Sequence, residues 1–381
     1  MPNQPFDVAV IGLGAAGSAA LWQLAARGGR AVGFDRHVPP HHFGSSHGDS
    51  RIIRAAYHEH PLYVPLVQRA FVLWRELEAR SGVPLLTRSG AVIAGPAGDG
   101  MVTDAERSAQ LHGLPHERWT ARELSANVPA LRVPDSFAAV WEPGAGVLAP
   151  ERCIAAMLRE ARRESAEIVV DTPVTGWRAE RDHVVVATAA RDYRVGRILL
   201  TAGPWMPEIV PDLPLPLTRE RVVQCWFDPA VAPHRFAAGS FPVFLIEDEA
   251  RRLFYGLPDT GRGVKAAFHH GGEPTTMADV RRRVTHEESA AVREALGRWV
   301  PDAAGPLREA TVCLYTNTPD GHFLLDRHPR TPRAVIASCC SGHGFKFAPA
   351  IGEMLADLAT GAPPRFDPAP FGLGRFPAFR A

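Results

Sequence analysis

The sequence predicts an α/β protein with two domains, a Rossmann-like dinucleotide-binding domain and a second domain built on a mixed sheet. A strand, a glycine-rich turn and a helix follow one another at the N-terminus, as in a βαβ unit. Helix and strand patterns alternate further along, and residues 217–315 are rich in strand patterns. Because the two kinds of segment interleave, we expect each domain to be built from non-contiguous pieces. The first would comprise 1–84, 145–216 and 317–381, and the second 85–144 and 217–316.

The N-terminal unit contains the G-x-G-x-x-G pattern of dinucleotide-binding proteins. A buried-strand run at residues 6–11 leads into Gly12, Gly14 and Gly17, and a helix is expected at 18–27. Gly12 permits the tight turn, Gly14 lets the backbone approach a pyrophosphate, and Gly17 lets helix and strand pack closely. The helix N-terminus would then face the phosphates.

A second apolar strand, residues 31–34, ends in Asp35, where a βαβ unit places a carboxylate that binds an adenosine ribose. The motif with its strand, helix and acid predicts dinucleotide binding, but it does not distinguish NAD from FAD. The residues expected to contact the dinucleotide here are Gly12, Gly14, Ala15, Ala16, Gly17, Asp35, Arg36 and Ser45.

Composition excludes several classes of protein. The chain has 381 residues, of which 46% are hydrophobic, so it can bury one large core or two ordinary ones. Its 42 Lys and Arg nearly balance 41 Asp and Glu, which leaves no basic field for nucleic acid and no polybasic membrane anchor. The five cysteines have neither disulfide-scaffold density nor zinc spacing. We therefore expect a cytoplasmic enzyme with small-molecule partners and no metal site. For the oligomeric state, which composition does not decide, we expect a monomer.

Other elements follow from periodicity and from breaker residues. Helices are expected at 61–80, 151–163, 287–299 and 349–360. Strands returning to the dinucleotide-binding sheet are expected at 168–170, 184–187 and 197–200. The proline-rich segment after Gly361 would wrap the surface.

Two strand patterns place polar residues on one face. Period two puts Lys265, Ala267 and His269 on one side of a strand and Val264, Ala266 and Phe268 on the other. It likewise puts Thr311, Cys313 and Tyr315 together, opposite Val312 and Leu314. On the pattern alone, a solvent-facing sheet surface and a buried hydrophobic cysteine are the commoner interpretations.

Two arginines, Arg51 and Arg54, lie three residues apart, a spacing that would share one face if this segment were helical. Arginine is suited to two-pronged capture of a carboxylate. Ordinary surface charge is the alternative.

Three longer strings decide between these interpretations. The chain contains HGDSRIIR in its first half, then CLYTNTPD and SGHGFKF in its second half. In these strings, and over nearly its whole length, it resembles the monomeric sarcosine oxidase family, which includes N-methyltryptophan and pipecolate oxidases. The resemblance implies the fold of the D-amino-acid-oxidase and glutathione-reductase type, and FAD as the cofactor.

The resemblance also implies roles for individual residues. Cys313 is similar to the cysteine that holds FAD covalently, and Arg54 with Lys346 resembles the pair that clamps the substrate carboxylate. Arg51 and Lys265 match cations beside the flavin, Lys265 being similar to the lysine that activates oxygen. The expected pocket residues are Tyr255, His269, Tyr315 and Leu245. The loop residues expected at the flavin are Gly342, His343, Gly344, Phe345 and Lys346. The helix near residue 349 would direct its positive end at the flavin.

The resemblance implies an oxidase of secondary α-amino acids that forms an imine and reduces O₂ to H₂O₂. Within that class, a biosynthetic oxidase of cyclic imino acids such as proline or pipecolate is the alternative. An NAD-dependent dehydrogenase, or a nucleotide-binding module without catalysis, is the alternative from another class. Cys339 and Cys340 depart from the family pattern, in which glycine and an aromatic residue are usual, as does Leu245, where the sarcosine enzymes often have methionine. Pocket shape and substrate size therefore stay open.

Overall fold

Residues 6–380 are described by a computed structural model, in which an eight-stranded sheet carries the glycine motif. Five strands run parallel, in the order β9 (Glu167–Val169), β2 (Ala31–Phe34), β1 (Phe6–Ile11), β12 (Asp192–Leu200) and β20 (Thr331–Ser338). β19 (Leu324–His328) pairs antiparallel with β20. The antiparallel pair β10 (Val174–Ala179) and β11 (Val184–Thr188) extends from the first half of β12. The carboxyl ends of β1 and β2 meet at the glycine turn and Asp35.

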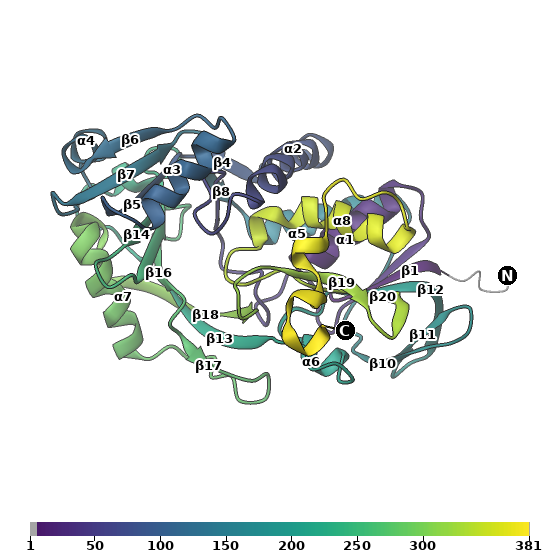
Figure 1. The fold of residues 1–381 in the computed structure, drawn as a ribbon. Helices are drawn as coiled ribbons and strands as arrows, with labels where there is room; N and C mark the ends of the chain where they lie inside the picture. Colours follow the sequence, from purple (N-terminus) through teal and green to yellow (C-terminus); the bar gives the residue numbers. More distant parts are fainter. Residues whose placement is uncertain (1–5, 381) are drawn as a thin grey trace.

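Helices cover one face of this sheet (Figure 1). They are α1 (Ala15–Ala26), α2 (Tyr63–Ser81), α5 (Pro150–Arg163) and α8 (Ala348–Thr360). The opposite face packs on the β10–β11 hairpin and on Leu373 and Phe376 from the C-terminal segment. The central strands are continuously apolar because they are buried on both faces.

A nine-stranded mixed sheet forms the second layer, seen on the left of Figure 1. Its path is β17 (Glu273–Pro274), β13 (Thr218–Phe227), β16 (Val264–His269), β15 (Leu253–Leu257), β14 (Val243–Glu247), β5 (Ala91–Pro96), β7 (Phe137–Glu142) and β6 (Glu117–Thr120). β18 (Leu307–Asn317) also pairs with β13. The helix α7 (His286–Trp299) packs on one face, and α3 (Met101–Leu111) and α4 (Ala121–Asn127) lie at the β5–β7 end.

A small third sheet joins β3 (Arg51–Ile53), β8 (Gly146–Leu148) and β4 (Leu86–Arg88), and β4 and β8 lie between the two large sheets in Figure 1. Arg51 and Arg54 therefore do not share the face of a helix, as their spacing would have allowed. Their segment is a strand, because the backbone of residues 51–53 pairs with β8. Residue spacing alone could not reveal that long-range pairing.

The other expected helices and strands are confirmed within a few residues of their predicted ends. The short helix α6 (Met206–Ile209) and a series of 3₁₀ turns complete the chain, including η4 (Phe345–Phe347), η5 (Ala369–Phe371), η6 (Leu373–Arg375) and η7 (Pro377–Phe379). No helix within residues 6–380 is long and apolar enough to cross a membrane. The domain boundaries themselves stay a prediction.

Candidate active site

A cavity of about 700 Å³ follows the glycine motif along the edge of the eight-stranded sheet. The predicted dinucleotide contacts that line it are Gly12, Gly14, Ala15, Ala16, Asp35, Arg36 and Ser45. Gly17 does not line it, because its role is packing. A Cβ atom on Gly17 would lie 1.8 Å from the carbonyl oxygen of Gly12, so only glycine allows this approach of helix and turn.

Asp35 is held in place at the end of β2. Its carboxylate accepts hydrogen bonds from the backbone amides of Leu13 and His37 at 2.8 and 2.9 Å, and His41 Nε2 lies 3.4 Å away. Burial alone would raise the pKa of Asp35, but the contacts with His41 and the two amides lower it below its usual value. The result is a fixed, ionised acceptor in the cavity wall.

A second cavity of about 90 Å³ adjoins the first, and Ser45 and Cys340 line both. Its wall brings together every residue expected at the substrate, at the oxygen site and in the glycine-rich loop after β20. These are Arg51, Arg54, Leu245, Tyr255, Lys265, His269, Tyr315, Gly342, His343, Gly344, Phe345 and Lys346. Residues far apart in the sequence thus converge at one end of the dinucleotide groove.

The alternation of β16 explains how the large sheet supplies this wall. Val264, Ala266 and Phe268 pack with α7 in one apolar cluster, while Lys265 and His269 line the cavity on the other side. The predicted sharing of faces is confirmed. The alternative of a solvent-facing surface is wrong, because Lys265 is only 1% exposed.

Lys265 is fixed against the segment that precedes β3. Its Nζ donates to the backbone carbonyls of Gly48 and Ser50 at 2.7 and 2.9 Å, and it lies 5.1 Å from the centre of the Trp226 ring. Burial holds the pKa of Lys265 well below its ordinary value, and nearby Arg51 adds to that effect. The lysine is therefore a positioned ammonium whose charge is expensive to maintain.

Arg54 lies just beyond the end of β3 and is 2% exposed, so the alternative of ordinary surface charge is wrong. Its Nη2 donates to both carboxylate oxygens of Glu59, at 2.9 and 2.8 Å, and its Nη1 donates to the Ala56 carbonyl at 2.8 Å. The guanidinium also lies 4.4 Å from the centre of the Tyr57 ring. Although burial would raise the pKa of Glu59, Arg54 holds it well below its usual value.

Lys346 approaches from η4, on the other side of Tyr57. Its Nζ donates to the backbone carbonyl of His343 at 2.7 Å and to the Tyr57 hydroxyl at 3.3 Å. Burial and the neighbouring Arg54 lower the pKa of Lys346 to about 7. Two cations thus share one buried site, and Glu59 is the acid paired with Arg54.

Lys265 and Lys346 are the only two lysines of the chain, since the other 40 of its 42 basic residues are arginines. Arginine stays charged in any protein environment, whereas a buried lysine can change its protonation near neutral pH. The ammonium groups of both lysines therefore lie in the same small cavity.

Three aromatic and imidazole groups form the neutral part of the wall. His269 Nδ1 lies 3.3 Å from the Tyr315 hydroxyl, and Gln224 donates to the Tyr255 hydroxyl at 3.5 Å. Burial lowers the pKa of His269 well below its usual value and raises the pKa of both tyrosines. All three groups are uncharged near neutral pH, so they can direct a ligand without adding charge.

Cys313 lies behind this wall and is fully buried. Its Sγ is 3.5 Å from Arg51 Nη2 and 3.6 Å from the Ser45 carbonyl, and the side chain lines neither cavity. Cys340 packs against Cys313 and lines both cavities. Of these two thiols, that of Cys340 therefore lies nearer the open groove, and Cys340 is one of the positions at which the chain departs from the family pattern.

Two residues that help to build the site were not identified from the sequence. Glu142, on β7, accepts hydrogen bonds from the backbone amides of Ala55 and Ala56 at 2.7 and 2.9 Å and so fixes the loop after Arg54. Tyr57, between the two cations, is another. Their roles depend on partners far away in the chain, and no local pattern marks them.

Buried polar atoms in the cavity wall lack protein partners. Among residues 6–380, Ser50 Oγ and Gln224 Oε1 have no hydrogen-bond partner, although both residues line the smaller cavity. Burying such atoms unpaired is costly. They suit a bound group with several donors and acceptors.

Comparisons with known proteins agree with this geometry. The family model described as FAD dependent oxidoreductase matches residues 7–358. Monomeric sarcosine oxidase of Streptomyces avermitilis is 40% identical over 358 residues, which cover 93% of each chain. N-methyl-L-tryptophan oxidase of Salmonella heidelberg is 36% identical over 374 residues, or 97% of this chain and 99% of the relative. The structure of NikD, an amino acid oxidase essential for nikkomycin biosynthesis, has a TM-score of 0.85 at 21% identity, over 97% and 98% of the two chains, which shows a shared fold.

Proposed function

Since the chain belongs to the family of FAD dependent oxidoreductases, beside monomeric sarcosine oxidase and N-methyl-L-tryptophan oxidase, we propose that it oxidises secondary α-amino acids. The substrate would bear an N-methyl group or a cyclic amine, and the products would be an imine and H₂O₂, with O₂ as the final acceptor. One observation supports this most strongly: buried Arg54 and Lys346 meet in a cavity that continues from the dinucleotide groove.

The larger cavity fits FAD. Gly14 leaves room for a pyrophosphate, since a Cβ atom there would meet only Ser46 Oγ, at 3.5 Å, and Asp35 offers a fixed acceptor to a ribose. The loop from Gly342 to Lys346 lines the smaller cavity, whose unpaired Ser50 and Gln224 oxygens suit a polar ring system. When bound there, FAD would supply the acceptor for a hydride equivalent taken from the amine.

Substrate positioning would come from the two cations. A carboxylate placed between Arg54 and Lys346 gains charge-assisted hydrogen bonds in a site shielded from water. Fixing that carboxylate orients the rest of the molecule toward the neutral wall of Tyr255, His269 and Tyr315, which contributes proximity and orientation. The amine must enter neutral, and the uncharged wall favours that form.

Oxygen reduction would depend on Lys265, with Arg51 beside it. Negative charge develops on O₂ as it is reduced, and an ammonium already held by the Gly48 and Ser50 carbonyls can stabilise it without reorganising. The carboxylate clamp and the oxygen site are thus assigned to different lysines of one cavity.

Covalent attachment of FAD through Cys313 is also part of the proposal. Its Sγ lies 3.5 Å from Arg51 Nη2 and 3.6 Å from the carbonyl of Ser45, which lines both cavities, so the thiol stands beside the proposed flavin site. Cys340 offers a second thiol at the groove and is the internal comparison for testing that assignment. The scattered, odd number of cysteines supports the further proposal of a cytoplasmic location. The similarity to a monomeric sarcosine oxidase supports the proposal of a monomer.

A panel assay of H₂O₂ release tests the proposed reaction. N-methyl amino acids, proline and pipecolate should each be compared with the corresponding primary amino acid and with the methyl ester of the same substrate. We expect release only with secondary amines that retain a free carboxylate. Preference for proline and pipecolate over N-methyl amino acids would favour the cyclic imino-acid oxidase, whereas no release with any of them would refute the proposal.

A further inference from the structure

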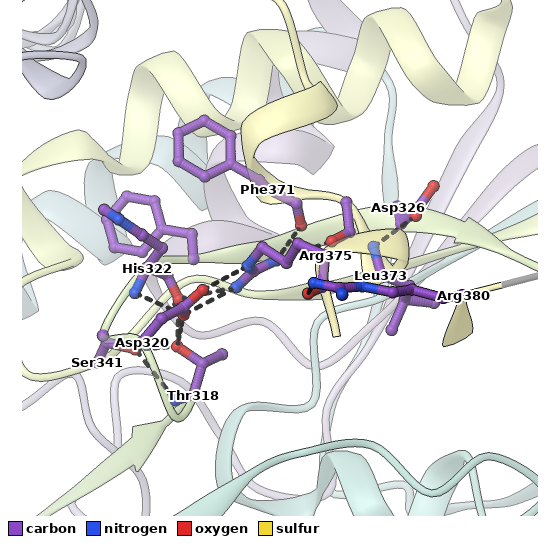
Figure 2. A network of polar contacts seen from close by, with 12 residues as sticks. Thr318, Asp320, His322, Asp326, Ser341, Phe371, Leu373, Arg375 and Arg380 are labelled. Carbon is purple, nitrogen blue, oxygen red and sulfur yellow. Dashed lines mark hydrogen bonds and ion pairs between the residues drawn. The ribbon is translucent and has the colours of Figure 1, made fainter. Parts of the chain in front are cut away.

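Arg375 ties the C-terminal segment to a turn beside the candidate active site (Figure 2). It ends η6, and its side chain is mostly buried. Its Nε and Nη2 donate to the two carboxylate oxygens of Asp320 at 2.8 and 3.3 Å, while Nη1 donates to the carbonyls of Phe371 and Gly372 at 2.7 and 3.0 Å. Such a two-pronged pair fixes orientation as well as distance.

Asp320 in turn organises the segment between β18 and β19. Its Oδ1 accepts a hydrogen bond from the backbone amide of His322 at 3.1 Å and lies 3.0 Å from Thr318 Oγ1. Arg375 Nη2 also reaches the His322 carbonyl at 3.4 Å. Between them, Gly321 adopts a φ of 72°, a left-handed conformation that favours glycine. The direction of the Gly321 carbonyl therefore depends on the pair of Asp320 and Arg375.

That carbonyl fixes the protonation of His343. The Gly321 oxygen lies 3.0 Å from His343 Nε2 and can only accept, so Nε2 carries the proton. Nδ1 must then accept from the Tyr57 hydroxyl, 2.6 Å away. The oxygen of Tyr57 is left to accept from Lys346 Nζ at 3.3 Å. The whole chain of donors and acceptors from Gly321 to the ammonium has a single direction.

This chain reaches the two cations at the point where they would hold a carboxylate. Lys346 is placed by the Tyr57 hydroxyl and the His343 carbonyl, and the guanidinium of Arg54 packs over the ring of the same tyrosine. A rotation of the Gly321 peptide would remove the acceptor that fixes the proton on His343 Nε2. His343 Nδ1 would then no longer be fixed as the acceptor for the Tyr57 hydroxyl.

We propose that Arg375 is a positioning residue for the carboxylate clamp, acting through the Asp320 turn, His343 and Tyr57 on Lys346. The inference rests on the proposed function, since it assumes that Arg54 and Lys346 bind a carboxylate. It assigns to the C-terminal segment a share in substrate recognition, although Arg375 itself lines neither cavity.

The test compares two ligands of one shape. Cyclopentanecarboxylate has the ring and carboxylate of proline without a reacting amine, and cyclopentanecarboxamide replaces its charge by a neutral amide. Dissociation constants of both would be measured by the change in flavin absorbance, in the holoenzyme and in Arg375→Ala, Arg375→Lys and Asp320→Asn. Arg365→Ala is the matched control, because Arg365 is an exposed arginine of the same segment whose side chain makes no hydrogen bond or ion pair within residues 6–380.

We expect the three variants of the pair to bind the carboxylate about 3- to 30-fold more weakly, a range typical of mutations that act through a network. Binding of the amide should change much less, and Arg365→Ala should resemble the wild type. Lysine at position 375 keeps the charge but not the two-pronged geometry, so it should fall between wild type and alanine.

Other outcomes overturn the inference in distinguishable ways. Equal loss of both ligands would make Arg375 a general structural support and not a positioning residue for the clamp. If Arg375→Ala does not fold, the other two variants decide. Wild-type affinity for the carboxylate in both Arg375→Lys and Asp320→Asn would then overturn the inference. A wild-type enzyme that does not discriminate between carboxylate and amide would instead refute the carboxylate clamp itself.

Discussion

Replacing Lys346 by methionine should remove a pH dependence from the binding of carboxylate ligands. The lysine is buried, and the cost of burying its charge beside Arg54 lowers its pKa to about 7. Methionine keeps the length of the side chain and loses the charge. The perturbation therefore separates the ammonium from its packing against Tyr57 and Phe347.

The sign of the effect follows from which form binds. A carboxylate needs the protonated lysine, which is present below a pH of about 7 and lost above it. Affinity should be highest below that pH and fall as the pH rises. At two units above its pKa, about 1% of the lysine remains charged, which corresponds to ~2.7 kcal/mol, or up to ~100-fold in affinity.

Other groups around Lys346 should not produce the same profile. Burial lowers the pKa of His343 to about 4 and that of His58 to about 3, so both are neutral throughout the range. Glu59 is ionised and Arg54 is charged at the same pH values. Lys265 is the other lysine of the cavity, and the Lys346→Met variant leaves it in place.

The assay is a titration with cyclopentanecarboxylate from pH 6 to 9, followed by flavin absorbance. Because the chain has only two lysines, NMR of protein carrying isotope-labelled lysine should give two side-chain signals, and Lys346→Met should assign them. We expect the missing signal to titrate near 7 and the variant to bind with a flat profile. An affinity that is equal in both proteins, or a wild-type midpoint near 10, would refute the reasoning.

Three further outcomes are expected. FAD should stay with the precipitated protein in acid, and Cys313→Ala should release it while Cys340→Ala keeps it; the reverse pattern would move the attachment to Cys340. Lys265→Met should slow reoxidation of the reduced enzyme by O₂ at least ~100-fold and slow anaerobic reduction by substrate less, as stopped-flow traces of the two half-reactions would show. Arg54→Ala should weaken cyclopentanecarboxylate at least tens-fold, since removing one partner of a desolvated charge pair costs ~2 to 5 kcal/mol, and an unchanged dissociation constant would place the clamp elsewhere.

Features with a local physical cause could be predicted from the sequence. The turn at Gly12 and Gly17 follows from steric limits that only glycine satisfies, and the structure shows the close approach. The shared face of Lys265 and His269 follows from the period of a strand, whichever strands lie beside it. Their burial did not follow, because period two is equally compatible with a solvent-facing sheet.

Features that depend on distant partners could not be predicted from local patterns. The spacing of Arg51 and Arg54 is compatible with a helix, and only the pairing of their segment with β8 shows that it is a strand. Glu142, Tyr57 and Arg375 carry no signal in their own neighbourhoods. Each acts through a hydrogen bond to a residue that only the fold brings near.

The most direct test of the central claim is anaerobic bleaching of the flavin absorbance at about 450 nm, a property of the cofactor itself. Proline, pipecolate and N-methyl amino acids would be added to the enzyme in the absence of O₂, beside their methyl esters. The account predicts that at least one secondary amino acid bleaches the flavin and that its ester, without a carboxylate for Arg54 and Lys346, does so far more slowly. Bleaching at equal rates by acid and ester, or by no secondary amino acid at all, would contradict it.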